Sequence, residues 1–325
     1  MAGERGSVAL WVALPWAGED AYYGEDASRA ARRLEELGVS GVVQGDHVFL
    51  PGVAARDPRA RMAADCVTTL TTIAAGARSL GVASLVSNVG LRHPLHVLRA
   101  FAQLALLYGG ERVYAGLGAG WSSMEFEALG TPMPPHAERL RRLEEAAILA
   151  RELFDHGFAT VRGAYVNASD LPLAPAPATP PRLLLGGGSE AVLTLASRYA
   201  DHVDLAPPPR LGGTVFQRPL LCTTDDLVAS AGLARGGARP LTTSLLVTAC
   251  VFCDAPSVPR EEEMLCRGVG LSPRSLADCP YVLVGEPRRM ADLVRERAER
   301  IGLDWLIVPA SAAERFACEV MPLLA

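Results

Sequence analysis

Glu111-Arg-Val-Tyr-Ala-Gly-Leu-Gly-Ala-Gly-Trp-Ser-Ser-Met-Glu125 is the stretch from which the architecture of this chain can be inferred. Its first half is a run of β-forming residues, 113–117, and a helical pattern begins after the glycine-rich turn. Glycines in such a turn let the backbone take φ > 0 and approach a flat ligand without a Cβ in the way. They serve equally well to pack a strand end, and the acidic residue that a dinucleotide fold places about 20 positions on is missing. The turn, formed by Gly116, Gly118 and Gly120, therefore leaves the function open at this point.

The same alternation of strand and helix continues along the chain in both directions. Helical periodicity is clearest over 137–154, where apolar residues recur at intervals of three and four. Eight alternating strand-like and helical runs predict an α/β protein, a TIM-like (β/α)8 barrel that forms a single domain over 1–325. Residues 206–240 interrupt the alternation with prolines and glycines, and we interpret them as an insertion at the C-terminal rim that acts as a lid. The expected strands are 8–14, 40–44, 81–86, 113–117, 182–185, 202–205, 242–252 and 304–308.

The composition excludes several classes of protein. The 325 residues carry a net charge of −5 and include no lysine, which argues against nucleic-acid binding, a Schiff-base lysine and a P-loop. Seven scattered cysteines favour a reducing compartment, and Cys250-Val-Phe-Cys253 lacks the second pair that a zinc site needs, so we expect no metal. No apolar run reaches the roughly 18 residues that span a membrane. We therefore expect a cytoplasmic protein with a small-molecule substrate.

Two polar motifs follow predicted strands, at the barrel end where such folds carry their chemistry. Asp46-His47 ends the second strand, and a histidine there can exchange a proton near neutral pH, unless it only caps a loop. Gly186-Gly187-Gly188-Ser189 opens a helix after the fifth strand. The free N–H groups and the helix dipole suit a phosphate there, with Ser189 as N-cap or as phosphate ligand. In the alternative, the glycines are needed only for packing and Ser189 only caps the helix.

Taken together, these residues resemble the bacterial-luciferase-like superfamily, and in particular its branch of oxidoreductases that use the deazaflavin coenzyme F-420. The motifs stand in the family's order across nearly the whole chain. The matching segments are 45–51 (Gly-Asp-His-Val-Phe-Leu-Pro), 91–94 (Leu-Arg-His-Pro), 110–130 (from Gly-Glu-Arg through Gly-Ala-Gly-Trp to Glu-Phe-Glu-Ala-Leu-Gly), 184–187 with 197–201, and 281–287.

The resemblance implies one reduced flavin or deazaflavin lying across the strand ends of the barrel. It implies that His47 is the proton donor or acceptor beside the ring and that Asp46 hydrogen-bonds the cofactor. A non-prolyl cis peptide bond against the ring would fall at Ser84-Leu85, with Ser87 nearby. The segment from Gly186 to Ser189 would hold the cofactor phosphate, and the family also implies a homodimer.

The chain departs from the family at three places, one of which is Leu140, where the family often has a glycine after the arginine of the long helix. Asp201-His202-Val203 stands where the family usually has Asp-Gly-Trp. Some deazaflavin dehydrogenases have a glutamate directly after the glycine run, and here that position is Trp121. We interpret Trp121, together with Trp16, as a wall of a largely apolar substrate pocket.

Three functions remain open on the sequence. The first is hydride transfer between coenzyme F-420 and a small organic substrate with a C=C, C=N or C=O bond, with His47 supplying or accepting the proton. The second is a monooxygenase that takes reduced FMN from a separate reductase and uses oxygen. The third is a flavin- or deazaflavin-binding protein without catalysis. Preference for one cofactor over the other separates the first two, and an absence of redox turnover favours the third.

Overall fold

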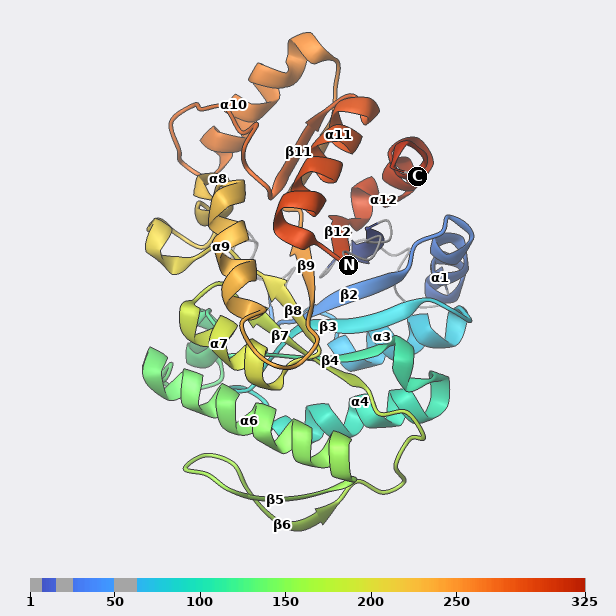
Figure 1. The fold of residues 1–325 in the computed structure, drawn as a ribbon, viewed down its shortest axis with the longest axis vertical. Helices are drawn as coiled ribbons and strands as arrows, with labels where there is room; N and C mark the ends of the chain where they lie inside the picture. The colour runs from blue at the N-terminus through green and yellow to red at the C-terminus, as the bar shows by residue number, and fades with distance from the viewer. Residues whose placement is uncertain (1–7, 16–25, 50–62, 325) are drawn as a thin grey trace.

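Eight parallel strands form a closed barrel in the computed structural model, which describes residues 8–15, 26–49 and 63–324 (Figure 1). The order around the barrel is β1-β12-β9-β8-β7-β4-β3-β2, so that strands adjacent in the circle are almost all sequential in the chain. This confirms the predicted TIM-like (β/α)8 fold. The barrel strands are β1 (Ala9–Ala13), β2 (Gly41–Asp46), β3 (Gly81–Asn88), β4 (Val113–Gly118), β7 (Arg182–Gly187), β8 (His202–Leu205), β9 (Thr242–Leu246) and β12 (Trp305–Pro309).

Helices on the outside of the barrel follow each of these strands (Figure 1). The predicted amphipathic helix is α6 (His136–His156), and its apolar stripe, including Leu143, Ala147 and Ala150, is buried as the periodicity indicates. The other outer helices are α1 (Ala27–Glu36), α3 (Cys66–Gly76), α4 (Pro94–Tyr108), α7 (Glu190–Tyr199), α9 (Thr224–Ala234), α11 (Pro287–Arg297) and α12 (Ala310–Glu319). Three further helices lie within the connections between these elements: α5 (Ser123–Ala128), α8 (Arg218–Leu221) and α10 (Val258–Gly268).

The expected seventh strand, 242–252, is wrong as a single element. The chain changes partners after β9: the N–H of Val247 still bonds the Ile307 carbonyl of the barrel, whereas the N–H of Thr248 bonds Tyr281, both at 2.8 Å. The rest of the run is β10 (Ala249–Phe252), which pairs with β11 (Val282–Gly285) outside the barrel. The whole run is rich in β-forming residues on both sides of Thr248, so its composition does not reveal where the partner changes.

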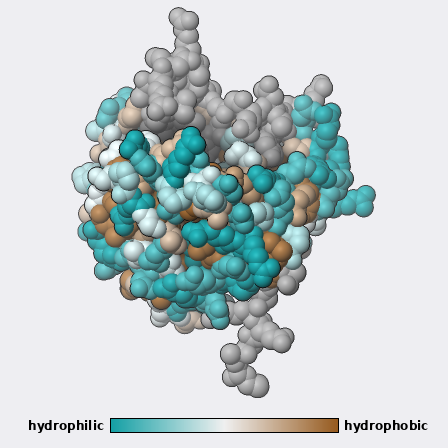
Figure 2. All heavy atoms as spheres, turned by 90° about the horizontal axis from the view of Figure 1, so that it is seen from above, coloured by the Kyte–Doolittle hydropathy of each residue, from teal (hydrophilic) through white to brown (hydrophobic). Residues whose placement is uncertain are grey.

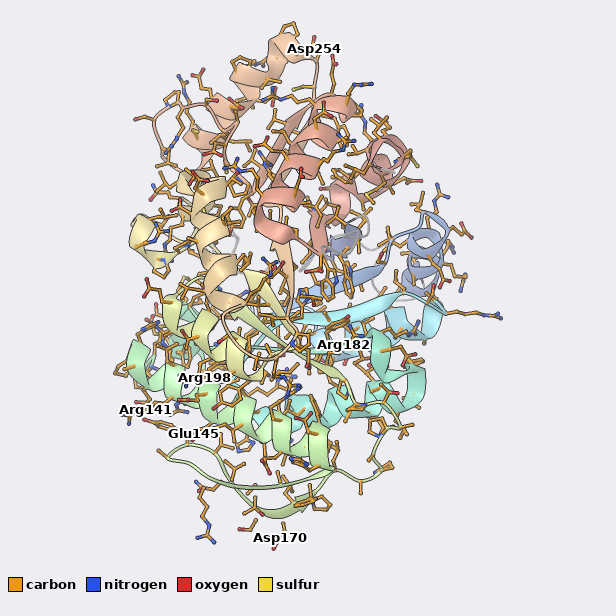
Figure 3. The ribbon with its side chains drawn as sticks, viewed as in Figure 1. Arg141, Glu145, Asp170, Arg182, Arg198 and Asp254 are labelled. Atoms are coloured by element: carbon orange, nitrogen blue, oxygen red, sulfur yellow. The ribbon has the colours of Figure 1, made fainter. Side chains whose placement is uncertain are left out.

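A hairpin outside the barrel, β5 (Phe158–Arg162) and β6 (Asn167–Pro172), was not anticipated. It lies against α6 at the lower edge of the view in Figure 1. Glu145 of α6, labelled in Figure 3, accepts hydrogen bonds from the backbone N–H groups of Ala164, Tyr165 and Val166 at 2.7–2.9 Å. These bonds fix the hairpin turn on the helix, and they lower the pKa of the Glu145 carboxyl.

The segment 206–240, expected to be a lid, contains two different parts. Its second half is α9, which begins with a capping box between Thr223 and Asp226 and buries Leu227 and Ala231 toward the barrel. Only the first half, 206–223 with the short α8, approaches the C-terminal ends of the strands. The lid stays a prediction, and it applies to this shorter segment.

Aromatic rings close the N-terminal end of the barrel. Trp305 stacks on Trp11 with ring centroids 3.9 Å apart, and on its other neighbour, His202, at 3.6 Å. Tyr114 meets Trp305 edge-on at 4.6 Å, and its hydroxyl accepts a hydrogen bond from Arg182. Figure 3 labels Arg182. Burial strongly lowers the pKa of His202, so this imidazole belongs to the packed core in its neutral form.

We expect Gly41→Ala to destabilise the protein. A Cβ at Gly41 would lie 2.4 Å from the Trp11 ring, which is buried and cannot move aside. Overpacking of this kind costs about 1–3 kcal/mol in the free energy of unfolding. Gly232→Ala is the matched control, because that glycine is exposed within α9 and a Cβ there meets nothing within 4 Å. The control should raise stability by up to about 1 kcal/mol; urea unfolding of both variants measures the contrast, and equal effects would contradict it.

None of the helices in the described part of the chain has the length and apolar character that crossing a membrane needs. The face of the molecule shown in Figure 2 is mainly hydrophilic, with small separate apolar patches.

Candidate functional site

The C-terminal ends of the strands surround a cavity of ≈ 490 Å³. Its walls come from four strand ends that the sequence singled out and from the segment 206–223. The floor is apolar, formed by Leu85 and Val86 of β3 and Leu246 of β9. The predicted site residues that line it are Asp46, His47, Leu85, Trp121, Gly186, Gly187, Gly188 and Ser189. This location matches the C-terminal face at which (β/α)8-barrel enzymes carry their active sites.

His47 is held by a carboxylate that sequence reasoning did not select. Its Nδ1 lies 3.1 Å from both Oε1 and Oε2 of Glu125, on α5. The Glu125 side chain is buried, and its Oε1 also accepts the backbone N–H of Val48 at 2.7 Å. The carboxylate thus fixes the orientation of the imidazole and the backbone that carries it. Because Nδ1 donates to Glu125 in this arrangement, Nε2 is the nitrogen with which the ring can exchange a proton at the cavity.

Asp46 lies beside His47 at the cavity wall, with Arg92 as its partner. Arg92 Nη2 is 3.4 Å from Asp46 Oδ1 and 3.0 Å from Asp65 Oδ2, so one guanidinium bridges two carboxylates. Burial raises the pKa of Asp46, and the positive charge of Arg92 opposes that shift. In the strand pairing Asp46 stands opposite Ser87 of β3. Ser87 itself is fully buried and is not part of the cavity wall.

The cis peptide bond of β3 lies one residue later than expected, between Leu85 and Val86. Ser84 therefore stands before the bulge, inside the barrel wall. Its hydroxyl donates to the carbonyl of Gly116 at 3.0 Å and accepts the N–H of the same residue at 2.8 Å. Ser84 thus ties β3 to β4 and does not line the cavity.

The three glycines between residues 111 and 125 have different structural roles. A Cβ at Gly116 would lie 1.8 Å from the Ser84 carbonyl oxygen, so this glycine is required by strand packing. Gly118 and Gly120 line the cavity. A Cβ at Gly118 would meet Val86 Cγ2 at 2.3 Å, and Gly120 has φ +76° beside Asn88. Two of the three glycines therefore lie at the cavity, and the close approach of a flat ligand to them stays a prediction.

The segment from Gly186 to Ser189 leads from β7 into α7 along the opposite part of the wall. Ser189 is the N-cap of α7, and its Oγ accepts the Val192 N–H at 3.3 Å. A Cβ at Gly188 would lie 2.2 Å from the Ala206 carbonyl oxygen, so the glycine also lets the segment 206–223 approach. The structure thus shows the capping and packing uses that the sequence left open, and phosphate binding stays a prediction.

Trp121 connects the histidine to the segment 206–223. Its ring meets His47 edge-on with centroids 5.6 Å apart, and meets Phe216 at 6.2 Å. With 42% of its surface exposed, it stands at the cavity entrance rather than deep inside. Trp16, the other predicted pocket residue, lies outside the described residues.

Asp204 is a second titratable residue of the cavity that sequence reasoning missed. It lies in β8, two residues after His202 on the inward face of the strand, and only 8% of it is exposed. Ser244 donates a hydrogen bond to its Oδ1 at 2.7 Å. Burial raises the pKa of Asp204 to about 7. Strand alternation could have revealed it, because residues 202 and 204 share one face of a strand.

Asp204 should make the stability of the protein depend on pH. Between pH about 4 and 7 the unfolded carboxyl is ionised, whereas the folded one, with a pKa of about 7 against 3.8, keeps its proton. The folded state then binds more protons, so stability falls as the pH rises through this range, by at most roughly 4 kcal/mol. Asp204→Asn should remove this part of the slope. Urea unfolding of both proteins at pH 4.5 and 7 measures the difference, and parallel pH profiles would contradict it.

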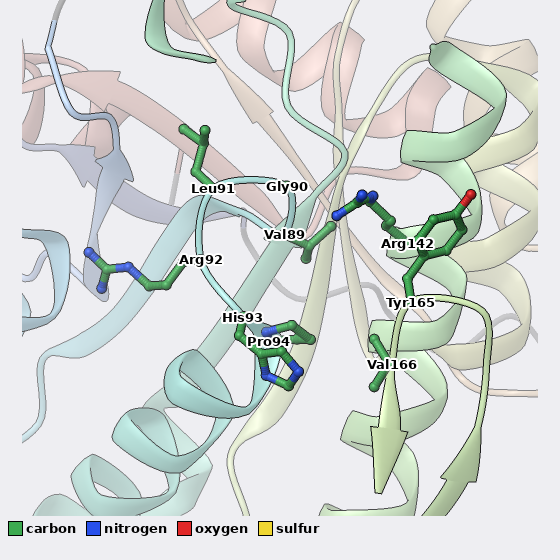
Figure 4. Close-up of a pocket in the computed structure, with 9 residues that line it drawn as sticks. All are labelled: Val89, Gly90, Leu91, Arg92, His93, Pro94, Arg142, Tyr165 and Val166. Atoms are coloured by element: carbon green, nitrogen blue, oxygen red, sulfur yellow. The ribbon is translucent and has the colours of Figure 1, made fainter. Parts of the chain in front are cut away.

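A second cavity, of ≈ 180 Å³, lies between the loop after β3 and the α6–hairpin layer (Figure 4). Its arginines already have partners. Arg142 binds Glu138 and lies over the Tyr165 ring, and Arg92 binds Asp46 and Asp65. In the described residues no group of three or more His, Cys, Asp or Glu side chains is placed to hold a metal ion. The larger cavity is therefore the candidate site.

A barrel with this cavity, with a histidine–glutamate pair on one side and glycines along the wall, has the architecture of a (β/α)8-barrel enzyme. The family model described as luciferase-like monooxygenase matches residues 4–214, and the chain belongs to this family.

Curated relatives cover only parts of the chain. An F420-dependent hydroxymycolic acid dehydrogenase of Mycobacterium tuberculosis is 38% identical over 109 residues, which is 34% of this chain and 30% of the relative. An F420-dependent glucose-6-phosphate dehydrogenase of Kribbella flavida is 32% identical over 180 residues, 54% of this chain and 51% of the relative. An FMNH(2)-dependent dimethylsulfone monooxygenase of Pseudomonas fluorescens is 32% identical over 90 residues, 28% of this chain and 25% of the relative. The chain thus spans about half of these relatives' lengths or less.

Solved structures agree on the fold. An F420-dependent secondary alcohol dehydrogenase, solved with an F420-acetone adduct, superimposes with a TM-score of 0.72 at 18% identity, covering 98% of this chain and 100% of that one. At this identity the likeness establishes the barrel and its connections, and leaves substrate and cofactor to the site itself.

Proposed function

We propose that the protein is an oxidoreductase that transfers a hydride between coenzyme F-420 and a small organic substrate, with His47 as the proton donor or acceptor. The observation that carries the proposal is the His47–Glu125 pair at the edge of a cavity with a glycine-lined wall and an apolar floor. Two of the relatives described above use F-420.

The residues of the cavity fit a planar ring with a phosphate-bearing chain. Gly118, Gly120 and Gly186 present no side chain to the space above Leu85 and Val86, and an added Cβ at Gly118 or Gly186 would meet Val86 within 3 Å. The start of α7 supplies backbone N–H groups for a phosphate. Arg139 and Arg218 line the same cavity and supply the positive charge that a lysine-free chain needs for an anion.

Each residue has a separate part in the proposed reaction. Bound coenzyme F-420 would supply or accept the hydride. In the reducing direction the substrate carbon gains that hydride and its heteroatom gains a proton from His47 Nε2, so that C=O becomes CH–OH. Glu125 keeps the proton of Nδ1 in place and holds the ring at the cavity. Trp121 shields the entrance from water together with Phe216.

The second candidate is a monooxygenase that uses reduced FMN from a separate reductase. The description of the family and the dimethylsulfone monooxygenase relative favour it. Titration of the purified protein with F-420 and with FMN, each oxidised and reduced, distinguishes the two candidates. Tighter binding of F-420 supports hydride transfer, whereas tighter binding of reduced FMN with oxygen uptake contradicts it. A homodimer remains a prediction, which light scattering coupled to gel filtration tests.

A further inference from the structure

The cavity is bounded by titratable groups on opposite walls. His47 directly follows β2, and Asp204 lies in β8. In the closed barrel β3, β4 and β7 separate these strands on one side, and β1, β12 and β9 separate them on the other. The two strands are therefore diametrically opposed, and both residues line the cavity between them. The proposed proton exchange uses only the His47 side.

Asp204 lacks a positively charged partner in the described part of the chain. Its hydrogen bond from Ser244 occupies Oδ1, and no salt bridge of the described residues includes Asp204. The two arginines that line the cavity, Arg139 and Arg218, make their hydrogen bonds to backbone carbonyls, of Pro134 and Gly120 and of Gly213 respectively, and neither forms an ion pair with Asp204 in the described residues. A buried carboxyl without a cation costs free energy unless it is protonated or finds a partner in the bound molecule.

The surroundings of Asp204 select the kind of partner. The floor beside it is apolar, with Val86 and Leu246, and Gly186 is its neighbour in the strand pairing. A carboxylate or phosphate placed there would lose its water shell against this apolar floor, and no cation of the described residues pairs with Asp204 to compensate. An uncharged carbonyl oxygen can accept a hydrogen bond from the acid, and a hydroxyl can donate one to its oxygen.

We propose that Asp204 is a specificity-determining residue whose carboxyl hydrogen-bonds the oxygen of an uncharged carbonyl compound or of the corresponding alcohol. This inference rests on the proposed oxidoreductase function and names its substrate class. The raised pKa of Asp204, about 7, agrees with this role because it keeps the acid able to donate near neutral pH. Asp204 binds the substrate from the wall opposite His47, so the molecule is held at both sides of the cavity.

Cyclohexanone and cyclohexanecarboxylate are suitable probes, because they share a ring and differ in charge. Binding of each is measured by calorimetry at pH 6 to the full chain, with F-420 present and again without it. The unchanged protein should bind cyclohexanone more tightly than the carboxylate. Asp204→Leu should weaken cyclohexanone binding by about tenfold, the usual loss for one buried hydrogen bond. Asp204→Asn, which still donates but cannot ionise, should weaken it less and should keep the preference for cyclohexanone over the carboxylate.

Glu319→Gln is the control, since this carboxylate pairs with Arg315 on the surface of α12, away from the cavity. Thermal unfolding reports whether Asp204→Leu folds. If that variant does not fold, the cyclohexanone affinity of Asp204→Asn tests whether Asp204 binds the ketone. Unchanged cyclohexanone affinity in a folded Asp204→Leu protein, or preference of the unchanged protein for the carboxylate, would overturn the inference while the cofactor titration still stands. Failure to bind F-420 would instead overturn the proposed function, and the probe measurements without cofactor still test Asp204.

Discussion

His47→Ala should lower kcat by about 10²- to 10⁴-fold, the range that a positioned general acid or base contributes. The substituted side chain lines the cavity and makes its hydrogen bonds to Glu125, so its loss removes the proton donor without emptying a packed core. Cofactor affinity should change much less, because the glycine wall and the start of α7 are untouched. Oxidation of reduced F-420 by a panel of small ketones, enones and imines measures kcat, and fluorescence titration measures cofactor affinity.

A matched control is available among the other histidines. His156, at the end of α6, is exposed and distant from the cavity lining, so His156→Ala should leave kcat unchanged. Full turnover by His47→Ala would remove this residue from the mechanism. Absence of turnover in the unchanged protein with every acceptor would favour a binding protein without catalysis.

The sequence predicts the barrel well because each element carries its own local signal. Strand runs, helical periodicity and glycine stops depend on neighbours in the chain, and the eight strands stand close to the expected positions. The mistaken seventh strand has a different cause. The change of partner between Val247 and Thr248 depends on Ile307 and Tyr281, which are far away in sequence. No local pattern can specify it.

In the site, too, features set by neighbours in the chain were predictable and features set by residues distant in sequence were not. His47 and the segment 186–189 were predictable, because the C-terminal ends of parallel strands converge in space. Glu125 was not, because its partner His47 lies 78 residues away. The local pattern Ser122-x-x-Glu125 also matches a capping box, yet the Ser122 side chain makes no cap bond and the carboxylate turns to His47. A residue with two competing uses cannot be assigned from its neighbours alone.

Glu125→Gln should lower kcat by about 10²-fold with little change in the fold. The amide keeps an oxygen for the Val48 N–H but can present its NH₂ group to Nδ1 of His47. The ring would then favour the tautomer that carries its proton on Nε2, and the carboxylate that stabilises the charged imidazole would be lost, as in other histidine–carboxylate pairs. Glu127→Gln is the control, because Glu127 lies on the same short helix and is exposed.

The double variant His47→Ala/Glu125→Gln separates a positioning role from an independent one. If Glu125 acts only through His47, the double variant should turn over at the same rate as His47→Ala alone, because nothing remains for the carboxylate to orient. Losses that multiply would mean that Glu125, which lines the cavity beside His47, also contacts the reacting molecule itself. The same rate measurement therefore tests the geometry of the pair, two side chains 3.1 Å apart that the fold brings together from β2 and α5.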